Sequence, residues 1–207
     1  MLICGLNKYN NTLWQRFKMA LEIELKLKVD DFEPVVQKLK NLGGRFEGNF
    51  MQIDSYYDDS NDSLVKSDRC LRIRKHINHS GKAIELTYKG ARENHRFKTR
   101  REINLTVNKA DELAEVFEQL GYKLRLSLEK KRSLWEYKNC KVAFDELPIL
   151  GKFVEIEGPN DNIIEQVQKD LGLENIKHTP QSYAHLLEEA VAKSGVQNRN
   201  ITFKAGY

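Results

Sequence analysis

The sequence predicts an α+β fold: a closed eight-stranded antiparallel β tunnel with a charged interior and helices packed outside. Eight segments have the composition and alternation of strands, and four have the apolar spacing expected of helices. On most of the strands the charged residues fall on one face and the apolar residues on the other. Together these observations favour one large sheet whose polar face is enclosed.

The expected elements follow one another without a long linker. Strands are expected at 20–29, 46–57, 70–76, 83–89, 98–107, 122–137, 140–146 and 152–158. Helices are expected at 31–42, 109–120, 160–171 and 180–192. Gly43-Gly44 and Gly121 stand where helices should end, and Thr179-Pro180 resembles an N-cap followed by proline at the first helical position. Because no segment rich in Pro, Gly or Ser divides the chain, we expect one domain.

The two ends of the chain are expected to lie outside this domain. Residues 1–18 show no clear period, whereas Met19 opens the strong strand pattern MALEIELKLKV. We therefore interpret 1–18 as a poorly ordered extension, with Met1 and Met19 both open as the start. Residues 19–193 form the expected domain, and 194–207 are expected to be a loose C-terminal tail.

Composition excludes several classes of protein. The 34 basic and 30 acidic residues give a net charge of +4, which lacks the basic excess typical of a nucleic-acid binder. The chain has three cysteines, Cys4, Cys70 and Cys140, an odd number without metal-ligand spacing, so we expect neither a disulfide framework nor a zinc site. This cysteine usage fits a protein of the reducing cytoplasm. No apolar run approaches the roughly 18 residues of a membrane span, so no membrane association is expected.

The charged faces carry the functional signal. In the first strand Leu21, Ile23 and Leu25 alternate with Glu22, Glu24 and Lys26. The same parity recurs in later strands, which group Arg72 with Arg74, Glu85 with Thr87 and Lys89, Arg100 with Glu102 and Asn104, Lys130 with Arg132, and Glu155 with Glu157. The polar sets are therefore rich in residues of both charges.

Two arrangements satisfy this pattern. An open sheet would turn its polar face to water, which is ordinary for antiparallel sheets. A closed barrel would turn that face inward and leave no exposed strand edges. Because burying an unpaired ion costs about several kcal/mol of free energy, such a tunnel must be filled with water, paired internally or occupied by a charged ligand. Lys and Arg suit phosphate oxygens and carboxylates suit Mg²⁺ or Mn²⁺, so both clusters in one cavity would form a metal–polyphosphate site.

These residues also resemble a known family. Glu22-Ile23-Glu24-Leu25-Lys26 resembles the ExExK signature of the CYTH superfamily, the triphosphate tunnel metalloenzymes. The resemblance runs from about residue 19 to 190 and includes the segments Leu71–Arg74, Leu86–Gly90, Lys130–Arg132, Asp145–Glu146 and Gly151–Glu157. The pattern is most similar to the class IV adenylate cyclases.

The resemblance implies roles for individual residues. It implies that Mg²⁺ or Mn²⁺ is bound by Glu22, Glu24, Asp145, Glu155 and Glu157. It implies that phosphates are gripped during catalysis by Lys26, Arg72, Arg74, Lys89, Lys130 and Arg132, with Arg100 and Glu102 in the cofactor-binding set. Asn104 departs from the pattern, because many relatives carry an acidic residue there. Tyr183, by contrast, is interpreted as a core aromatic residue.

Three functions stay open on the sequence alone. The first is a class IV-type adenylate cyclase, which converts ATP to cyclic AMP and pyrophosphate. The second is a triphosphatase that hydrolyses inorganic triphosphate, thiamine triphosphate or nucleoside triphosphates. The third is a polyphosphate-binding module without catalysis, which would not need the full set of carboxylates. The expected partner is a small-molecule triphosphate, and a homodimer is left open.

Overall fold

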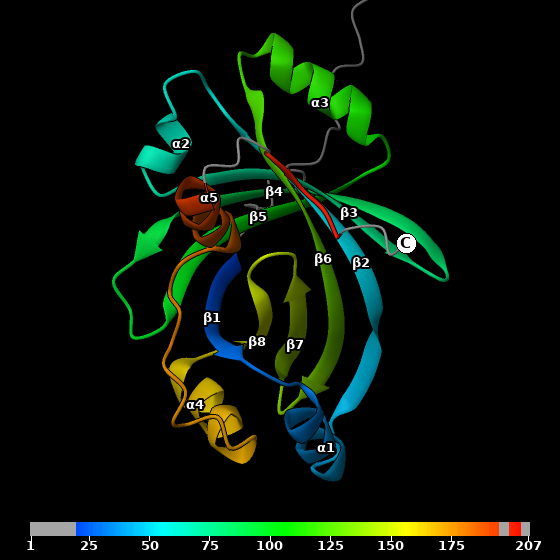
Figure 1. Cartoon of the computed structure of the whole chain (residues 1–207), viewed down its shortest axis with the longest axis vertical. Helices are drawn as coiled ribbons and strands as arrows, with labels where there is room; N and C mark the ends of the chain where they lie inside the picture. Colours follow the sequence, from blue (N-terminus) through cyan, green and yellow to red (C-terminus); the bar gives the residue numbers. More distant parts are fainter. Residues whose placement is uncertain (1–19, 195–198, 204–207) are drawn as a thin grey trace, which may run out of the picture.

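Eight antiparallel strands close into a barrel (Figure 1). The computed structural model describes residues 20–194 and 199–203 of the chain. The barrel strands are β1 (Ala20–Val29), β2 (Arg45–Asp58), β3 (Cys70–Asn78), β4 (Gly81–Glu93), β5 (Lys98–Val107), β6 (Lys123–Tyr137), β7 (Cys140–Leu147) and β8 (Gly151–Glu157). Their order is β2-β3-β4-β5-β1-β8-β7-β6, and β6 also pairs with β2. This last pairing closes the sheet, so the predicted closed arrangement is confirmed and the open sheet is excluded.

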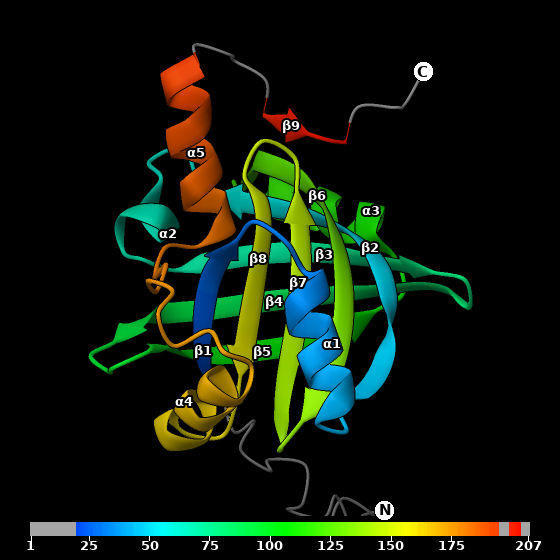
Figure 2. The same cartoon turned by 60° about the horizontal axis from the view of Figure 1, so that its bottom comes forward.

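In the part of the chain that the structure describes, five helices lie outside the barrel (Figure 2). They are α1 (Glu33–Asn41), α2 (Ser63–Lys66), α3 (Ala110–Gln119), α4 (Asp161–Asp170) and α5 (Tyr183–Ser194). Gly43 and Gly121 follow the ends of α1 and α3 with φ of 81° and 87°, a left-handed conformation that glycine adopts without steric cost. No helix of the described residues is long and apolar enough to cross a membrane.

The main hydrophobic core lies between the barrel wall and helices α1 and α4. Leu25 and Leu27 on β1 point outward, as the alternation predicts, and are almost completely buried. They belong to the same cluster as Leu39 of α1 and Ile164 of α4. Because these helices cover the apolar face of the strands, the opposite face of the same strands is left to line the interior.

A second apolar cluster joins α5 to the barrel. Tyr183 and Leu187 of α5 pack with Leu128 of β6 and Phe153 of β8. Ile201 joins them from β9 (Asn200–Ile201), a short strand that runs parallel to β6 at Ser127 and Leu128. The C-terminal segment therefore fixes α5 against the barrel through both backbone pairing and burial.

Three features differ from what the sequence predicts. The short helix α2 and strand β9 were not expected, and β9 lies within the segment predicted to be a loose tail. The predicted cap at Thr179-Pro180 is wrong, because the Thr179 N–H donates to Lys26 O at 2.8 Å and extends the sheet. α5 begins instead at Tyr183, after the Ser182 hydroxyl accepts a hydrogen bond from the His185 N–H. The extension predicted for 1–18 lies outside the described residues.

Candidate active site

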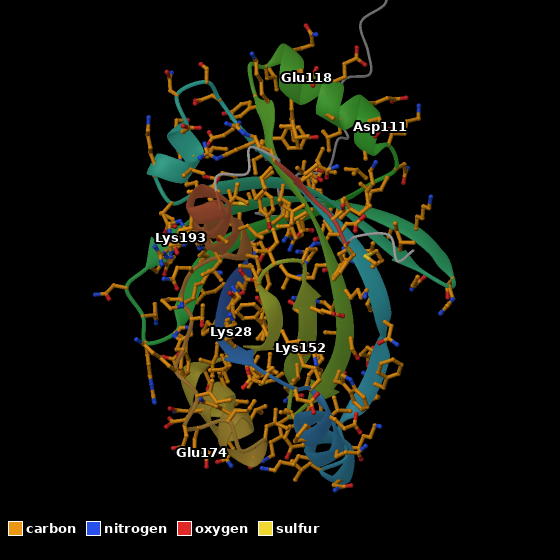
Figure 3. All side chains as sticks on the ribbon, in the orientation of Figure 1. Lys28, Asp111, Glu118, Lys152, Glu174 and Lys193 are labelled. Carbon is orange, nitrogen blue, oxygen red and sulfur yellow. The ribbon has the colours of Figure 1, made fainter. Side chains whose placement is uncertain are left out.

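One cavity of about 480 Å³ gathers the charged residues singled out in the sequence. All of those candidates except Asp145 line it, from Glu22 and Glu24 on β1 to Glu155 and Glu157 on β8. Asp111 and Glu118 on α3, by contrast, lie on the exposed outer surface (Figure 3). For these residues other than Asp145, the parity of the strands agrees with the lining of the cavity.

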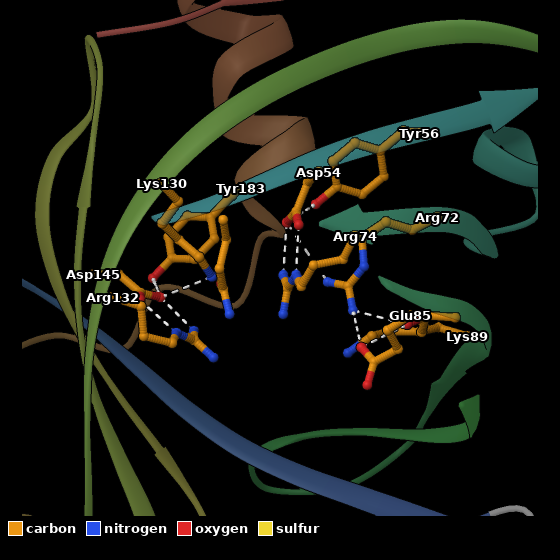
Figure 4. A network of polar contacts seen from close by, with 12 residues as sticks. Asp54, Tyr56, Arg72, Arg74, Glu85, Lys89, Lys130, Arg132, Asp145 and Tyr183 are labelled. Atoms are coloured by element: carbon orange, nitrogen blue, oxygen red, sulfur yellow. Dashed lines mark hydrogen bonds and ion pairs between the residues drawn. The ribbon is translucent and has the colours of Figure 1, made fainter. Parts of the chain in front are cut away.

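Asp145 lies immediately behind the cavity wall and holds three of its residues together (Figure 4). Arg132 Nε donates to Asp145 Oδ1 at 2.6 Å, and Lys130 Nζ donates to Oδ2 at 3.2 Å. The Tyr183 hydroxyl donates to the same Oδ2 at 3.0 Å. Burial alone would raise the pKa of Asp145, but Arg132 and Lys130 outweigh it and hold the pKa well below its usual range. Asp145 is therefore a buried anion that positions two cations.

Two buried lysines face the ring of Tyr183. Lys26 Nζ lies 4.2 Å from the ring centroid and Lys130 Nζ lies 5.1 Å from it. Lys26 also lies 3.4 Å from Glu24 and 3.3 Å from Glu155, so its ammonium bridges two carboxylates of the cavity. Burial and the neighbouring Arg132 lower the pKa of Lys130 to about 7, although Asp145 opposes that shift. Burial alone would lower the pKa of Lys26, but Glu24 and Glu155 outweigh it and raise that pKa, so Lys130 loses its proton more readily than Lys26.

Two arginines of β3 meet Asp54 on the neighbouring strand β2 (Figure 4). Arg74 donates to Asp54 through both Nε, at 2.5 Å, and Nη2, at 2.6 Å. Arg72 Nη1 lies 3.7 Å from Asp54 and its Nη2 donates to Thr87 Oγ1 at 2.9 Å. The Arg72 Nε is buried and makes no hydrogen bond with the described part of the chain. Arg72 thus keeps donor capacity for a ligand, whereas Arg74 is largely engaged.

The remaining cations pair with the carboxylates of β1 and its neighbours. Lys89 Nζ donates to both oxygens of Glu22, at 2.8 and 2.7 Å, and lies 3.3 Å from Glu102. Lys98 donates to Glu24 at 2.6 Å. Arg100 pairs instead with Asp68, at 2.6 Å, outside the set predicted from the sequence. The interior is thus a network of ion pairs between strands.

Comparison with known proteins decides the family of this chain. A family model described as the CYTH domain matches residues 20–183, which is most of the chain. The chain belongs to the CYTH domain family. A Methanocaldococcus jannaschii protein, whose name gives adenylate cyclase as a provisional assignment, is 30% identical over 162 residues, 75% of this chain and 90% of that protein. Adenylate cyclase CyaB of Aeromonas hydrophila is 28% identical over 188 residues, 86% of this chain and 94% of that protein.

A solved structure with a similar fold is known for a different activity. This Hippeastrum protein, provisionally assigned as an adenylyl cyclase, is reported to have a dominant triphosphatase activity. It covers 84% of this chain and 95% of its own, with a TM-score of 0.60 and 14% sequence identity. At this identity the likeness concerns the fold.

The carboxylates of this CYTH domain fit a hard divalent metal by donor type. Glu22, Glu24, Glu155 and Glu157 offer the oxygen ligands that Mg²⁺ and Mn²⁺ prefer. Within residues 20–194 and 199–203, however, no three Asp, Glu, His or Cys side chains are already arranged around a common metal position. Lys98 and Lys26 contact Glu24, and Lys141 contacts Glu157. Binding a metal here would require these ammonium groups to move.

Four residues of this CYTH site were not predicted from the sequence. They are Gln52, Asp54, Lys98 and Asp68. A signal existed for Gln52 and Asp54, because they alternate with Met51, Ile53 and Ser55 on β2 in the same way as the charged residues of β1. Tyr183 was interpreted as a core residue, but the structure also places its hydroxyl on Asp145.

Proposed function

We propose that this chain is a divalent-metal-dependent enzyme that acts on triphosphates, and more specifically a class IV-type adenylate cyclase. The supporting observation is the charge of the cavity wall. Twelve Lys and Arg residues line the cavity against eight Asp and Glu residues, so the wall has a positive excess that suits a polyanion. Asp54 and Asp145 behind the wall reduce that excess but do not cancel it.

The spacing of the cations along two strands also supports the proposal. Arg72 and Arg74 project from alternate positions of β3, and Lys130 and Arg132 from alternate positions of β6, so pairs of donors follow one direction along the cavity. If a chain of phosphates lay along these cations, their hydrogen bonds to carboxylates would be replaced by hydrogen bonds to phosphate oxygens. Such preorganised charges stabilise the transition state of phosphoryl transfer without covalent participation by the protein.

The cyclase reaction and triphosphate hydrolysis differ in the nucleophile, which is the ribose 3′-hydroxyl in the first and water in the second. In the cyclase reaction the ribose 3′-oxygen forms a bond with the α-phosphorus, the α–β phosphoanhydride bond breaks, and pyrophosphate leaves while the hydroxyl proton is released. A divalent ion, when bound by Glu22, Glu24, Glu155 and Glu157, would neutralise phosphate charge. Lys26, Arg72 and Lys130 would bind the non-bridging oxygens and hold the triphosphate in place.

Triphosphate hydrolysis is the second candidate. It is supported by the cationic wall itself, which fits any triphosphate chain, and by the activity reported for the Hippeastrum protein. Incubation with ATP, inorganic triphosphate and thiamine triphosphate in Mg²⁺ or Mn²⁺, followed by product identification, separates the two. Cyclic AMP and pyrophosphate from ATP would support the cyclase. ADP and phosphate, or rapid cleavage of inorganic triphosphate without cyclic AMP, would replace it with the hydrolase. Binding without any product would leave a polyphosphate-binding module.

A further inference from the structure

Part of the cavity wall is uncharged and partly apolar. Phe50 of β2 and Leu134 of β6 line the cavity, are half-buried, and belong to none of the hydrophobic clusters among the described residues. They lie on neighbouring strands, since Phe50 is opposite Arg132 in the β2–β6 register. Apolar side chains that face a cavity and pack into no core offer contact area for a ligand. A phosphate chain would gain nothing from an apolar surface, whereas a planar organic ring would pack against it.

Gln52 provides a hydrogen-bonding group beside this apolar surface. It is 2% exposed, lines the cavity and is opposite His76 of β3. Gln52 Nε2 lies 3.1 Å from His76 Nδ1. Burial and the neighbouring Arg74 lower the pKa of His76, which favours a neutral ring whose Nδ1 accepts this hydrogen bond. The His76 Nε2, which then carries the proton, lies 4.0 Å from Glu85.

This arrangement leaves the other end of the amide without a partner. Gln52 Oε1 is buried and accepts no hydrogen bond from the residues that the structure describes. A buried acceptor without a partner is unfavourable, so such atoms in native proteins point to a missing ligand or water. Because Nε2 is engaged by His76, the free group is specifically an acceptor, and it would be satisfied by an N–H donor of a ligand.

The uncharged surface adjoins the phosphate-binding cations. Gln52 is opposite Lys130 on β6, and Arg74 is two residues from His76 on β3. One ligand can therefore contact both regions if it carries a polyphosphate and a ring with an amino group. Glutamine pairs with adenine in this way in nucleic-acid recognition, where its oxygen accepts from the exocyclic amino group.

We propose that Phe50, Gln52 and Leu134 form a base subsite, in which Gln52 Oε1 accepts a hydrogen bond from the exocyclic amino group of adenine. The proposal deepens the proposed function and rests on it, since the cations are taken to hold the triphosphate. It names a nucleoside triphosphate with an adenine base as the preferred substrate class. Inosine triphosphate carries a carbonyl oxygen in place of that amino group. This oxygen would face Gln52 Oε1, and two acceptors cannot form a hydrogen bond.

Calorimetric titration in EDTA tests the subsite without turnover. The full chain is titrated with ATP, inosine triphosphate and inorganic triphosphate, and the titrations are repeated with Gln52→Leu. The wild type should bind ATP about tenfold more tightly than inosine triphosphate, as expected for one specific hydrogen bond. Gln52→Leu should remove that preference and leave the affinity for inorganic triphosphate unchanged. Asn49→Leu is the matched control, because Asn49 is an exposed amide on β2 outside the cavity.

The outcomes separate this proposal from the function on which it rests. Equal affinity for ATP and inosine triphosphate, or a preference that survives Gln52→Leu, would overturn the base subsite while the triphosphate site stands. No binding of inorganic triphosphate, either in EDTA or after Mg²⁺ is added, would overturn the proposed function and the subsite with it. If Gln52→Leu does not fold, Phe50→Ala replaces it. It should weaken ATP and inosine triphosphate about equally while inorganic triphosphate is unaffected, and unchanged ATP binding would contradict the proposal.

Discussion

Arg74 holds Asp54 through two parallel hydrogen bonds, from Nε at 2.5 Å and from Nη2 at 2.6 Å. Both side chains are buried, and Arg72 lies 3.7 Å from the same carboxylate. The pair joins β2 to β3 at the wall of the cavity. Arg74 therefore has a structural role in addition to the phosphate contact proposed for it, and Asp54 is part of the same arrangement although the sequence did not single it out.

Asp54→Asn should destabilise the fold. The substitution keeps the shape of the side chain but leaves the buried Arg74 without its counter-charge and Arg72 with Glu85 alone, which costs about 3 kcal/mol or more of unfolding free energy. Urea denaturation measures the loss. Asp111→Asn is the matched control, because Asp111 is fully exposed in its pair with Lys75 and should change stability very little. Equal stability of Asp54→Asn and the wild type would contradict the assigned role.

The contribution of Asp54 should also depend on pH. Burial alone would raise the pKa of Asp54, but Arg74 and Arg72 outweigh it and hold the pKa far below its usual range. A carboxyl with a depressed folded pKa contributes stability that is fully present above its unfolded pKa of about 3.9 and is lost as pH falls toward the folded pKa. The difference in unfolding free energy between wild type and Asp54→Asn should be constant from pH 7 to about pH 5 and shrink below about pH 4. A constant difference down to about pH 2 would argue against this linkage.

Arg72→Ala should disable turnover of any triphosphate that the protein accepts. Removing one preorganised charge typically costs about 10²–10³ in rate. Arg72→Lys should recover part of the activity, because it restores the charge but not the planar set of donors. Steady-state kcat and KM report the effect. Arg45→Ala is the control, since Arg45 is exposed and pairs with Glu47 and Glu136. Turnover that is normal in Arg72→Ala would remove Arg72 from the site.

Chelation should abolish turnover, and Mg²⁺ or Mn²⁺ should restore it. Glu24→Gln should raise the metal concentration needed for half-maximal activity, because it removes one of the proposed oxygen ligands. Glu24 is also buried beside Lys98, so the same substitution should lower thermal stability, and the titration is done below the unfolding transition. Glu146→Gln, on an exposed pair with Lys131, is the control. Full activity in the presence of chelator would exclude the metal assignment.

Tyr183 should contribute to stability through two separable interactions. Tyr183→Phe removes the hydrogen bond to Asp145 but keeps the ring beside Lys26, and should cost about 1 kcal/mol. Tyr183→Ala also removes a buried ring from the α5 cluster and should cost about 3–5 kcal/mol. Denaturation of both variants measures the difference. Similar losses for the two would show that the hydroxyl, not the ring, anchors α5.

The strands and their inward residues could be predicted because alternation is a local property. Glu22, Glu24 and Lys26 face inward because they alternate with apolar residues of β1. Those apolar residues, such as Leu25 and Leu27, pack outward against α1 and α4. The partner of each charge could not be predicted, because register between distant strands decides it. Arg74 meets Asp54 rather than Glu85, its neighbour in the β3–β4 register, and Arg100 meets Asp68 in a turn.

Strand β9 escaped prediction for a different reason. Two residues are too few to show a period, and their place is determined by the free edge of β6 at Ser127 and Leu128. α5 was expected, but its start was misplaced, because residues 178 and 179 pair with β1 before the helix begins. In both cases a tertiary contact decides the local structure.

In the interior of the tunnel, cationic side chains are already paired with carboxylates of the same chain. Lys26, Lys89 and Arg74 each already hold a carboxylate oxygen where a phosphate oxygen would otherwise bind. Ligand entry is therefore an exchange of counter-ions, and its free energy is a small difference between two large attractions. When the proposed triphosphate leaves, the same carboxylates would pair again with Lys26, Lys89 and Arg74, so the wall would return to its paired state. Selection among polyanions in such a tunnel should depend on the spacing of their oxygens as well as on their charge, because each of these cations must leave a carboxylate before it can contact a phosphate.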